Sequence, residues 1–357
     1  MTTFDPTLVP HGVSRRGLLA VGAVALGGLL AGCSTARAAT SGGPVNIGYF
    51  PNVTHAPGLV ADTTGLLSKR LEVVKATPTV KSFNAGPDVI QAILSGSLDI
   101  SYIGPNPTIN AYVQSKGAGV RVIAGSTSGG ASLVVRAGIS SAADLKGKKL
   151  ATPQLGNTQD VALRYWLKSQ RLTTTKDGGG DVSILPQANS AAVQAFKAGA
   201  IDGGWLPEPY ASSLIKAGGS VLVDERTLWP DGRFVTTNII VRTEYLTQHP
   251  ETVRAFLEAH LDALDTIAKN SAAAQTAVAT QIKKITSQDQ DQAILASAWK
   301  NLAFGADPLA VTLKTSADHA DAVGLLAGKP GDGFAKLWSL DPLNAALTAR
   351  GQTPVSA

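Results

Sequence analysis

The sequence predicts an α/β protein of two similar lobes with a ligand cleft between them. Three observations lead to this fold class: β-rich runs alternate with helical patterns, a segment near residue 91 recurs about a hundred residues later, and 44% of the 357 residues are hydrophobic. A chain of this length and apolar content can bury one core in each of two lobes. The charged fraction of 16% and the lack of low-complexity tracts argue against intrinsic disorder.

Strands and helices are expected in alternation. Short apolar runs bounded by turn residues indicate strands at 45–50, 120–124, 132–136, 149–152, 182–185, 221–223 and 238–242. Helical spacing of apolar residues, often with proline at the start, indicates helices at 57–67, 86–94, 107–115, 158–169, 190–197 and 209–217. Beyond residue 250 the chain is mostly helical, with helices at 250–268, 271–285 and 289–301.

A duplicated segment indicates the two lobes. Residues 91–107 match residues 194–209, with one residue dropped before the final proline. The matched pairs are Gln91 and Gln194, Ala92 and Ala195, Gly96 and Gly199, Asp99 and Asp202, and Tyr102 and Trp205. The alternative is that any two α/β units share such features. Because open α/β sheets bind ligands beyond the carboxyl ends of their strands, we expect the loops 104–107 and 207–209 on facing walls of one cleft.

The amino terminus predicts export. A polar segment ends in Ser14-Arg15-Arg16, and the uncharged stretch 17–30 follows it. Fourteen residues are too few for a membrane-spanning helix, which needs about 20. A basic region before a short apolar stretch is typical of an export signal, and the paired arginines favour the twin-arginine route over the general secretory route, which stays open.

The only cysteine of the chain lies at the end of this apolar stretch. Leu30-Ala31-Gly32-Cys33 resembles the lipobox of bacterial lipoproteins. We therefore expect residues 1–33 to be an export signal, Cys33 to carry lipid, and residues 34–44 to form a flexible tether. The protein would then be anchored on the outer face of the cytoplasmic membrane. The alternative is a lone cysteine in an ordinary signal peptide.

Composition and motifs exclude several function classes. A single cysteine cannot form a disulfide within the chain, a CxxC redox site or a cysteine-based metal site. The net charge of +5 comes without a basic cluster beyond 146–149, which argues against nucleic-acid binding. The sequence has no GxSxG, HExxH or P-loop motif, so we expect no enzyme, no metal and no cofactor.

Five segments form a set that is more specific than any one of them. They are 49–57 (YFPNVTHAP), 103–107 (IGPNP), 152–160 (TPQLGNTQD), 205–210 (WLPEPY) and 229–237 (WPDGRFVTT). The set resembles the nitrate, sulfonate and taurine group of ABC-transporter substrate-binding proteins. The resemblance implies a type II periplasmic-binding-protein fold, with lobe 1 at 45–134 and 239–357, lobe 2 at 135–238, and crossings at 133–136 and 238–241. It also implies ABC permease and ATPase subunits as partners of a monomeric binding protein.

Helix N-termini and neutral donors suggest how an anion would be held. Unpaired backbone N–H groups and the helix dipole favour anions at such ends, which we expect at 55–58, 106–108 and 156–159. The candidate polar residues are Asn52, His55, Ser82, Asn84, Asn106, Asn157, Thr158, Gln159, Thr236 and Thr237. Each has a structural alternative, such as helix capping.

Two further candidates concern the rest of the ligand. Trp205, or alternatively Tyr102 or Phe50, would pack against an alkyl or aromatic tail, although such side chains often belong to a core. Glu208 would repel an anion, so it either caps the following helix or meets the cationic end of an aminosulfonate.

These observations predict capture of an aliphatic sulfonate, or a related small anion such as taurine, by hinge closure and its delivery to a permease. The chain after Cys33 contains no sulfur, which favours an organosulfur ligand over nitrate, with chance composition as the alternative. Other candidates are a nitrate, bicarbonate or thiamine-precursor binding protein, a sensor, or an enzyme resembling a pyrimidine synthase. The enzyme is disfavoured because that family's cysteine motif is missing.

Overall fold

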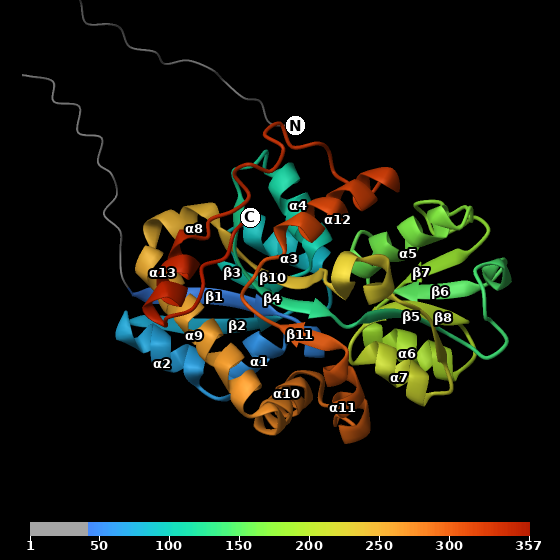
Figure 1. Ribbon diagram of the computed structural model, residues 1–357, viewed down its shortest axis with the longest axis horizontal. Helices are drawn as coiled ribbons and strands as arrows, with labels where there is room; N and C mark the ends of the chain where they lie inside the picture. Colours follow the sequence, from blue (N-terminus) through green and yellow to red (C-terminus); the bar gives the residue numbers. More distant parts are fainter. Residues whose placement is uncertain (1–41) are drawn as a thin grey trace, which may run out of the picture. The chain divides into compact units, whose positions relative to one another are not determined.

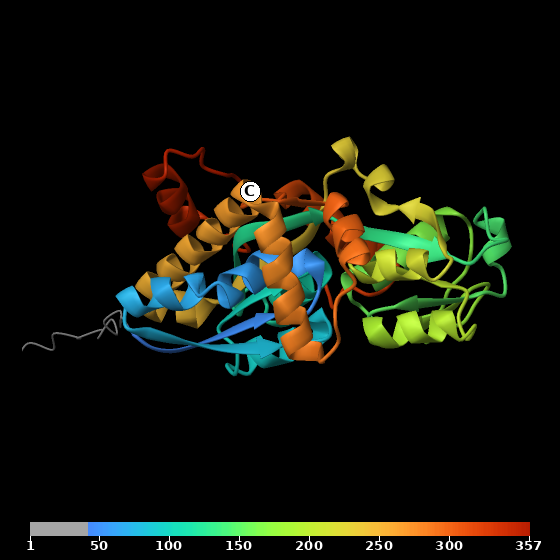
Figure 2. The same ribbon diagram turned by 90° about the horizontal axis from the view of Figure 1, so that it is seen from below.

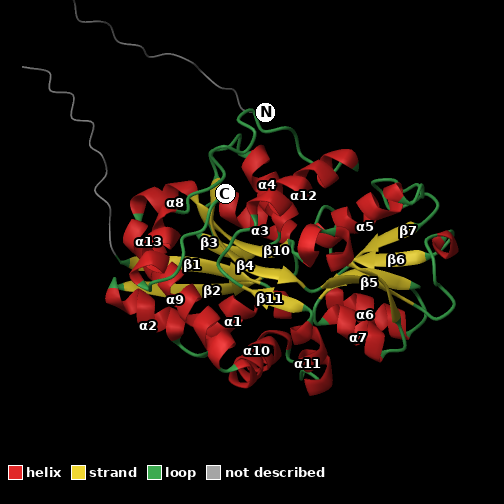
Figure 3. Cartoon of the chain, viewed as in Figure 1, coloured by secondary structure: helices red, strands yellow, loops and turns green. Residues whose placement is uncertain are grey.

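The computed structural model describes residues 42–357. The predicted export signal, the lipidation of Cys33 and most of the tether lie outside the described residues. Two β-sheets, each with helices on both faces, make up the described part (Figure 1, Figure 3). We call the first sheet and the helices that pack on it lobe 1, and the second sheet with its helices lobe 2.

The first sheet has six strands in the order β11-β4-β10-β3-β1-β2. Its strands are β1 (Gly43–Tyr49), β2 (Ala76–Ser82), β3 (Ile100–Ile103), β4 (Val120–Gly129), β10 (Val235–Arg242) and β11 (Leu302–Phe304). β1 is parallel to β2 and β3, whereas β10 is antiparallel to β3 and β4. β1 begins at Gly43, so the last two residues of the predicted tether belong to the sheet.

The second sheet repeats this arrangement in the order β7-β6-β8-β5-β9. Its strands are β5 (Ala131–Val135), β6 (Lys149–Thr152), β7 (Ser183–Pro186), β8 (Gly203–Pro207) and β9 (Ser220–Asp224). β6 is parallel to β7 and β8, and β5 is antiparallel to β8 and β9. β10 in the first sheet and β5 in the second therefore have corresponding positions, each antiparallel to the strand (β3 or β8) that belongs to the duplicated segment. This agrees with the duplication found in the sequence.

The duplicated residues hold the two sheets in the same way. The Asp99 carboxylate accepts the Asn46 N–H at 2.9 Å, and its carbonyl accepts the Arg242 N–H at 2.8 Å. The Asp202 carboxylate accepts the Lys149 N–H at 2.8 Å, and its carbonyl accepts an N–H of the antiparallel strand's end at 2.9 Å. These aspartates tie three strands together, so the repeat marks the fold and not a ligand.

Helices cover both faces of the first sheet. One face packs against α1 (Ala56–Thr63), α2 (Leu66–Val73), α9 (Pro250–Lys269) and α10 (Ser271–Thr286), and the two long helices α9 and α10 lie over this lobe in both views (Figure 2). The other face packs against α3 (Gly86–Leu94), α4 (Pro105–Gln114) and α12 (Ala310–Ala322). The single helix predicted at 57–67 is two helices, because Gly65 adopts a left-handed φ of 75° between them.

The second sheet lies between α5 (Thr158–Ser169) on one face and α6 (Asn189–Lys197) with α7 (Tyr210–Lys216) on the other (Figure 1). The remaining helices are α8 (Thr243–Gln248), α11 (Gln292–Lys300) and α13 (Asp341–Ala349). α11 belongs to the core of lobe 1 through Leu295 and Ala298, yet it also contacts α7 of lobe 2.

The chain changes sheets earlier than the predicted crossings. Between β4 and β5, Gly129 and Gly130 adopt φ angles of 78° and 72°, and a Cβ at Gly130 would lie 2.2 Å from Leu302 Cδ2. Two glycines therefore turn the chain where other residues would be strained and would clash. The segments 133–136 and 238–241 lie mainly within β5 and β10, because an apolar run looks the same at a crossing and inside a sheet.

Candidate ligand-binding site

A cavity lies where the strands of both sheets end. Its lining comes from the loops after β1, β2, β3, β6 and β7, from the end of β8 and from the start of β10. The space between its lining atoms, counting the part that is open to solvent, is about 300 Å³. The lining residues are Phe50, Asn52, Thr54, His55, Asn84, Gly104, Asn157, Thr158, Gln159, Asn189, Pro207 and Thr236. Both lobes contribute walls at the carboxyl ends of their parallel strands, as expected for an open α/β sheet.

Helix N-termini from both lobes point at this cavity. The residues that flank the first turns of α1, α4 and α5 are His55, Gly104 and Asn157, and Asn189 is the first residue of α6. In none of these four helices does the N-cap residue cap the helix with its own side chain. The first backbone N–H groups of α5 and α6, in lobe 2, have no partner within their helix, so they are available to a ligand that carries negative charge. Helices α1 and α4 of lobe 1 offer fewer donors, because Pro57, Pro105 and Pro107 have no N–H and Ala56 donates to the Val53 carbonyl.

The cavity lining contains no charged side chain. His55 is 2% exposed, and burial lowers the pKa of its imidazole to about 3, so the ring is neutral at neutral pH. Its Nδ1 accepts the N–H of Phe50 at 3.3 Å. An anion here would be held by dipoles and neutral donors, without a basic side chain as its counter-ion.

A buried ion pair supports the loop that leads into α5. Arg164 Nε lies 3.0 Å from Asp160 Oδ2, and both side chains are almost fully buried. Asp160 also accepts the Thr152 hydroxyl and the Gly156 N–H, each at 2.9 Å. The pair therefore fixes the loop that carries Asn157, but neither residue lines the cavity.

Two polar atoms at the cavity have no hydrogen-bond partner in the described protein. They are Thr158 Oγ1 and Asn189 Oδ1, from side chains that are 5% and 7% exposed. Leaving a buried polar group unpaired costs about 1–3 kcal/mol, and most such groups in folded proteins have a partner. Both atoms are therefore positioned to bond a ligand.

The two walls of the cavity lie close together. A Cβ at Gly104 of lobe 1 would lie 2.3 Å from Thr158 Oγ1 of lobe 2, and one at Gly86 would lie 3.4 Å from Asn157 Oδ1. Only glycine at position 104 permits this approach. The structure thus describes lobes closed around the cavity.

The structure brings seven of the residues predicted for the site to the cavity and leaves five elsewhere. The seven are Asn52, His55, Asn84, Asn157, Thr158, Gln159 and Thr236. Ser82 lines a neighbouring surface hollow, Asn106 Nδ2 donates to the Ser316 carbonyl at 2.9 Å, and Thr237 is wholly buried in β10. Trp205 is fully buried in the core of lobe 2, where its Nε1 donates to Glu225 Oε2 at 2.7 Å.

Glu208 turns away from the cavity. Its carboxylate accepts the N–H and the hydroxyl of Ser212, each at 3.0 Å, and the Asn301 Nδ2 at 2.7 Å. Burial raises the pKa of this carboxyl above its usual range. Of the two alternatives for Glu208, the structure has the helix-capping one, because these donors to the carboxylate lie on α7 and just after α11.

Sequence reasoning missed Thr54 and Asn189 in the lining and considered Phe50 only as an alternative, whereas Gly104 and Pro207 belong to the two loops expected on the cleft walls. Of the two missed residues, Asn189 was the easier to predict, since it follows a predicted strand and opens a predicted helix. Ser82 and Asn84 are candidates because of the same position in the first lobe. Applying the duplication to that loop would have selected Asn189 in the second lobe.

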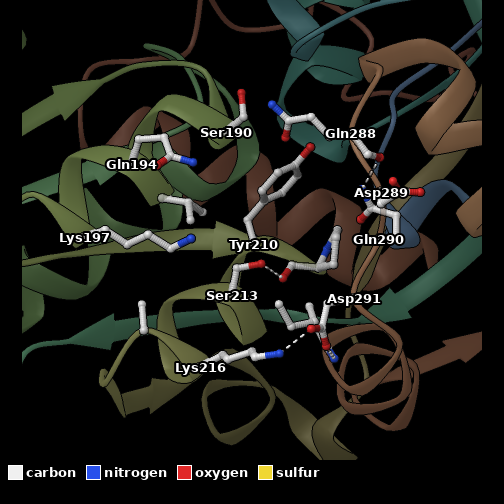
Figure 4. A pocket seen from close by; sticks show the side chains of 14 residues that line it. Ser190, Gln194, Lys197, Tyr210, Ser213, Lys216, Gln288, Asp289, Gln290 and Asp291 are labelled. Atoms are coloured by element: carbon white, nitrogen blue, oxygen red, sulfur yellow. Dashed lines mark hydrogen bonds and ion pairs between the residues drawn. The ribbon is translucent and has the colours of Figure 1, made fainter.

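A larger hollow lies outside this cavity, between α6, α7 and residues 288–294 (Figure 4). The space inside it, counting the part that is open to solvent, is about 1030 Å³, and Tyr210 stands at its centre. Asp289 and Asp291 line it, and Asp291 forms an ion pair with Lys216. Lys197 and Lys216 also line it, so its formal charges cancel. The smaller cavity, which residues at helix N-termini of both lobes line, is the better candidate for an anion.

The described residues 42–357 contain no candidate metal site and no candidate membrane span. Within residues 42–357 there is no group of three or more His, Cys, Asp or Glu side chains that could hold a metal ion. His319, which lies in the acidic run 318–321, stacks on Tyr165 with 3.7 Å between ring centroids. None of the helices in 42–357 is long and apolar enough to cross a bilayer.

Comparisons with known proteins agree with this geometry. The chain is 28% identical over 223 residues to the taurine-binding periplasmic protein of Escherichia coli, which covers 61% of this chain and 65% of that protein. The chain thus spans a little less than two thirds of that relative's length.

Solved structures share the fold. The alkanesulfonate-binding protein SsuA from Xanthomonas axonopodis pv. citri, bound to MOPS, matches with a TM-score of 0.65 at 20% identity, over 81% of this chain and 96% of that one. The periplasmic nitrate-binding protein NrtA from Synechocystis matches with a TM-score of 0.69 at 17% identity, over 86% and 88%. These likenesses confirm the predicted two-lobed periplasmic-binding-protein-like fold. Residues 39–282 match the NMT1-like family, and since this is more than half of the chain, the protein belongs to that family.

Proposed function

We propose that the protein is the extracytoplasmic substrate-binding component of an ABC importer and that its ligand is a small organic sulfonate, either an alkanesulfonate or taurine. The observation that carries this proposal is the neutral cavity, where helix N-termini from both lobes meet the unpartnered Thr158 Oγ1 and Asn189 Oδ1. Helix N-termini suit an oxyanion such as a sulfonate. The name of the taurine-binding relative supports the same ligand class.

The apolar part of the lining favours an organic anion over nitrate. Phe50 and Pro207 lie on the cavity beside the polar groups, on lobe 1 and lobe 2 respectively. An alkyl segment can pack against them, and it gains about 25 cal/mol for each Å² of apolar surface buried. Nitrate has no such segment. Nitrate, bicarbonate and a thiamine precursor remain the competing ligands.

Asn189 gives a reason to include an aminosulfonate. The carboxylate of Glu208, which the sequence offered for a ligand amine, is occupied by Ser212 and Asn301. The amide oxygen of Asn189 is a buried acceptor without a partner in the described chain. It can accept a hydrogen bond from the ammonium group of taurine while the helix N-termini hold the sulfonate.

Closure of the lobes would select the ligand. Contacts from Asn52 and His55 on lobe 1 and from Asn157 and Thr158 on lobe 2 are made together only when the lobes meet. A ligand favours the closed state by as much as it gains from these joint contacts. The wrong anion would leave buried polar groups unpaired, which lowers its affinity.

We further propose that the protein is exported, that lipid on Cys33 anchors it to the outer face of the cytoplasmic membrane, and that it works as a monomer with permease and ATPase subunits. The lone cysteine at the end of a lipobox supports the anchor. The relatives named as binding proteins favour capture and release of an unchanged ligand over catalysis.

The test is a binding screen with the purified full-length chain. Taurine, ethanesulfonate, nitrate and bicarbonate are compared by thermal shift and then by calorimetry, together with the Thr158→Ala variant and the Gly305→Ala control, which lies in open space. We expect the sulfonates to stabilise the wild type and the control, and to bind the Thr158→Ala variant more weakly. Nitrate binding without sulfonate binding, or chemical conversion of the ligand, would reject the proposal.

A further inference from the structure

Helices α7 of lobe 2 and α11 of lobe 1 lie side by side (Figure 1). Three polar pairs connect them: Lys216 with Asp291, Ser212 with Ser297 at 3.3 Å between the hydroxyls, and Glu208 with Asn301 at 2.7 Å. The residue numbers fall along α7 as they rise along α11. The pairs thus form one regular contact between the lobes, which we call the α7–α11 contact.

Glu208 ends this contact directly behind the cavity wall. The preceding residue, Pro207, lines the cavity, and the backbone carbonyl of Glu208 accepts the N–H of Val53 at 3.1 Å. Val53 lies between Asn52 and Thr54, which line the cavity from lobe 1. Residue 208 therefore connects lobe 2 to the loop of lobe 1 that faces the ligand.

Each partner of the Glu208 carboxylate is held in place. Ser212 lies in the first turn of α7, where the positive end of the helix dipole also stabilises the Glu208 carboxylate. Asn301 follows α11, and its Oδ1 lies 3.4 Å from Arg226, which is itself paired with Asp224. The side chain of Glu208 is only 1% exposed. Within residues 42–357, the Asn301 amide is the only group of the other lobe that donates a hydrogen bond to this carboxylate.

The chemistry of the α7–α11 contact suits a reversible closure. Each pair consists of polar groups that water can satisfy when the lobes separate, so opening exposes no unpaired group. In the closed state the carboxylate is buried, and a hydrogen bond to a charged buried group is among the stronger ones. The contact can therefore favour the closed state without preventing opening.

We infer that Glu208 and Asn301 are positioning residues, whose hydrogen bond between the lobes sets the closed state and thereby the ligand affinity. Neither residue lines the cavity. The effect on affinity rests on the proposed function, whereas the effect on closure does not. Removing the pair lowers the closed population, and the apparent affinity falls in proportion.

The first arm of the test measures binding of taurine and ethanesulfonate by calorimetry and stopped flow. We expect Asn301→Ala to bind about 10- to 100-fold more weakly, equivalent to about 1.4–2.8 kcal/mol, with faster dissociation. The control Gln292→Ala, on the exposed side of α11, should match the wild type. The loss of affinity should exceed any loss of thermal stability in the ligand-free Asn301→Ala variant, because only the closed part of the ligand-free population uses this bond.

The second arm measures closure without depending on the ligand's identity. The chain has one cysteine, so a Cys33→Ser background accepts a dye pair at Lys69→Cys on lobe 1 and Lys176→Cys on lobe 2, both exposed. Energy transfer should shift toward larger separations in Asn301→Ala and stay unchanged in Gln292→Ala. If the wild type binds no sulfonate, the proposed function fails and this arm still decides the inference.

Two results would overturn the inference. One is an Asn301→Ala variant with wild-type energy transfer, whatever its affinity. The other is a variant whose ligand-free melting temperature falls while its affinity and dissociation rate stay the same, because a merely structural role would give that pattern.

Discussion

Adding one methyl group at Gly104 should block closure of the cavity. Gly104 precedes α4 with φ −74° and ψ 162°, a conformation that alanine adopts without strain. In the closed structure the new Cβ would lie 2.3 Å from Thr158 Oγ1, whereas its contact with the Thr236 carbonyl, at 3.6 Å, is ordinary. The clash therefore arises between the lobes and not within lobe 1.

The size of the effect follows from this distance. Cβ contacts shorter than 3.0 Å essentially never occur, so the walls must separate or Thr158 must turn. Overpacking of this kind costs about 1–3 kcal/mol. Since 1.4 kcal/mol is tenfold in affinity, taurine or an alkanesulfonate should bind Gly104→Ala about 5- to 150-fold more weakly.

A double-mutant cycle by calorimetry isolates the clash. Thr158→Ala removes the hydroxyl, and the next atom of that side chain lies 3.4 Å from the added Cβ, a tolerable contact. The Gly104→Ala change should therefore cost much less in the Thr158→Ala background than in the wild type. Gly305→Ala, with nothing within 4 Å, is the control. Equal losses in both backgrounds, or no loss at all, would refute the reasoning.

Three further predictions concern specificity and stability. Asn189→Leu should weaken taurine more than ethanesulfonate, by about 1–3 kcal/mol in calorimetry, because only taurine loses an acceptor for its amine. Burial lowers the pKa of His55 and of His260 to about 3, so below pH 6.5 the unfolded chain binds protons that the folded chain does not. Each buried histidine should thus lower stability from pH 6.5 downward, by on the order of 1 kcal/mol at pH 5.5. Denaturant titrations measure this as the difference between the wild type and a His260→Gln variant, because burial raises the pKa of Glu225 to about 7 and so acts in the opposite direction. Asp160→Ala should lower the free energy of unfolding by about 3–5 kcal/mol, because it leaves Arg164 buried and unpaired.

Each of these predictions has a result that contradicts it. Equal losses for taurine and ethanesulfonate would remove Asn189 from amine recognition. The same pH dependence between pH 6.5 and 5 in the wild type and in His260→Gln would mean that this histidine gains its proton in the folded state. An Asp160→Ala variant as stable as an Asp177→Ala control, changed at an exposed position, would show that Arg164 finds another partner.

Local signals predicted much of the fold. α3 and α5 begin and end at the predicted residues, because proline, glycine and polar residues mark their ends in the sequence. The duplication predicted two similar lobes, and the corresponding strands of the two sheets lie in the same order. Helices α8, α12 and α13 were not predicted, since much of their stability comes from packing on elements far away in sequence.

The site was predictable where it depends on helix starts and less so where it depends on distant partners. Asn157, Thr158 and Gln159 lie at the cavity because they open α5 after a strand. Asn106 and Glu208 have similar local positions, but Ser316 and Asn301 bind their side chains. Partners 210 and 93 residues away leave no local signal in one sequence.

The central claim is that the closed neutral cavity binds an organic sulfonate and releases it unchanged. Calorimetric titration of the full-length chain with taurine and with ethanesulfonate, followed by mass spectrometry of the recovered ligand, tests it most directly. We expect saturable binding at one site and an unaltered ligand. Absence of binding to both sulfonates, or recovery of a converted product, would contradict it.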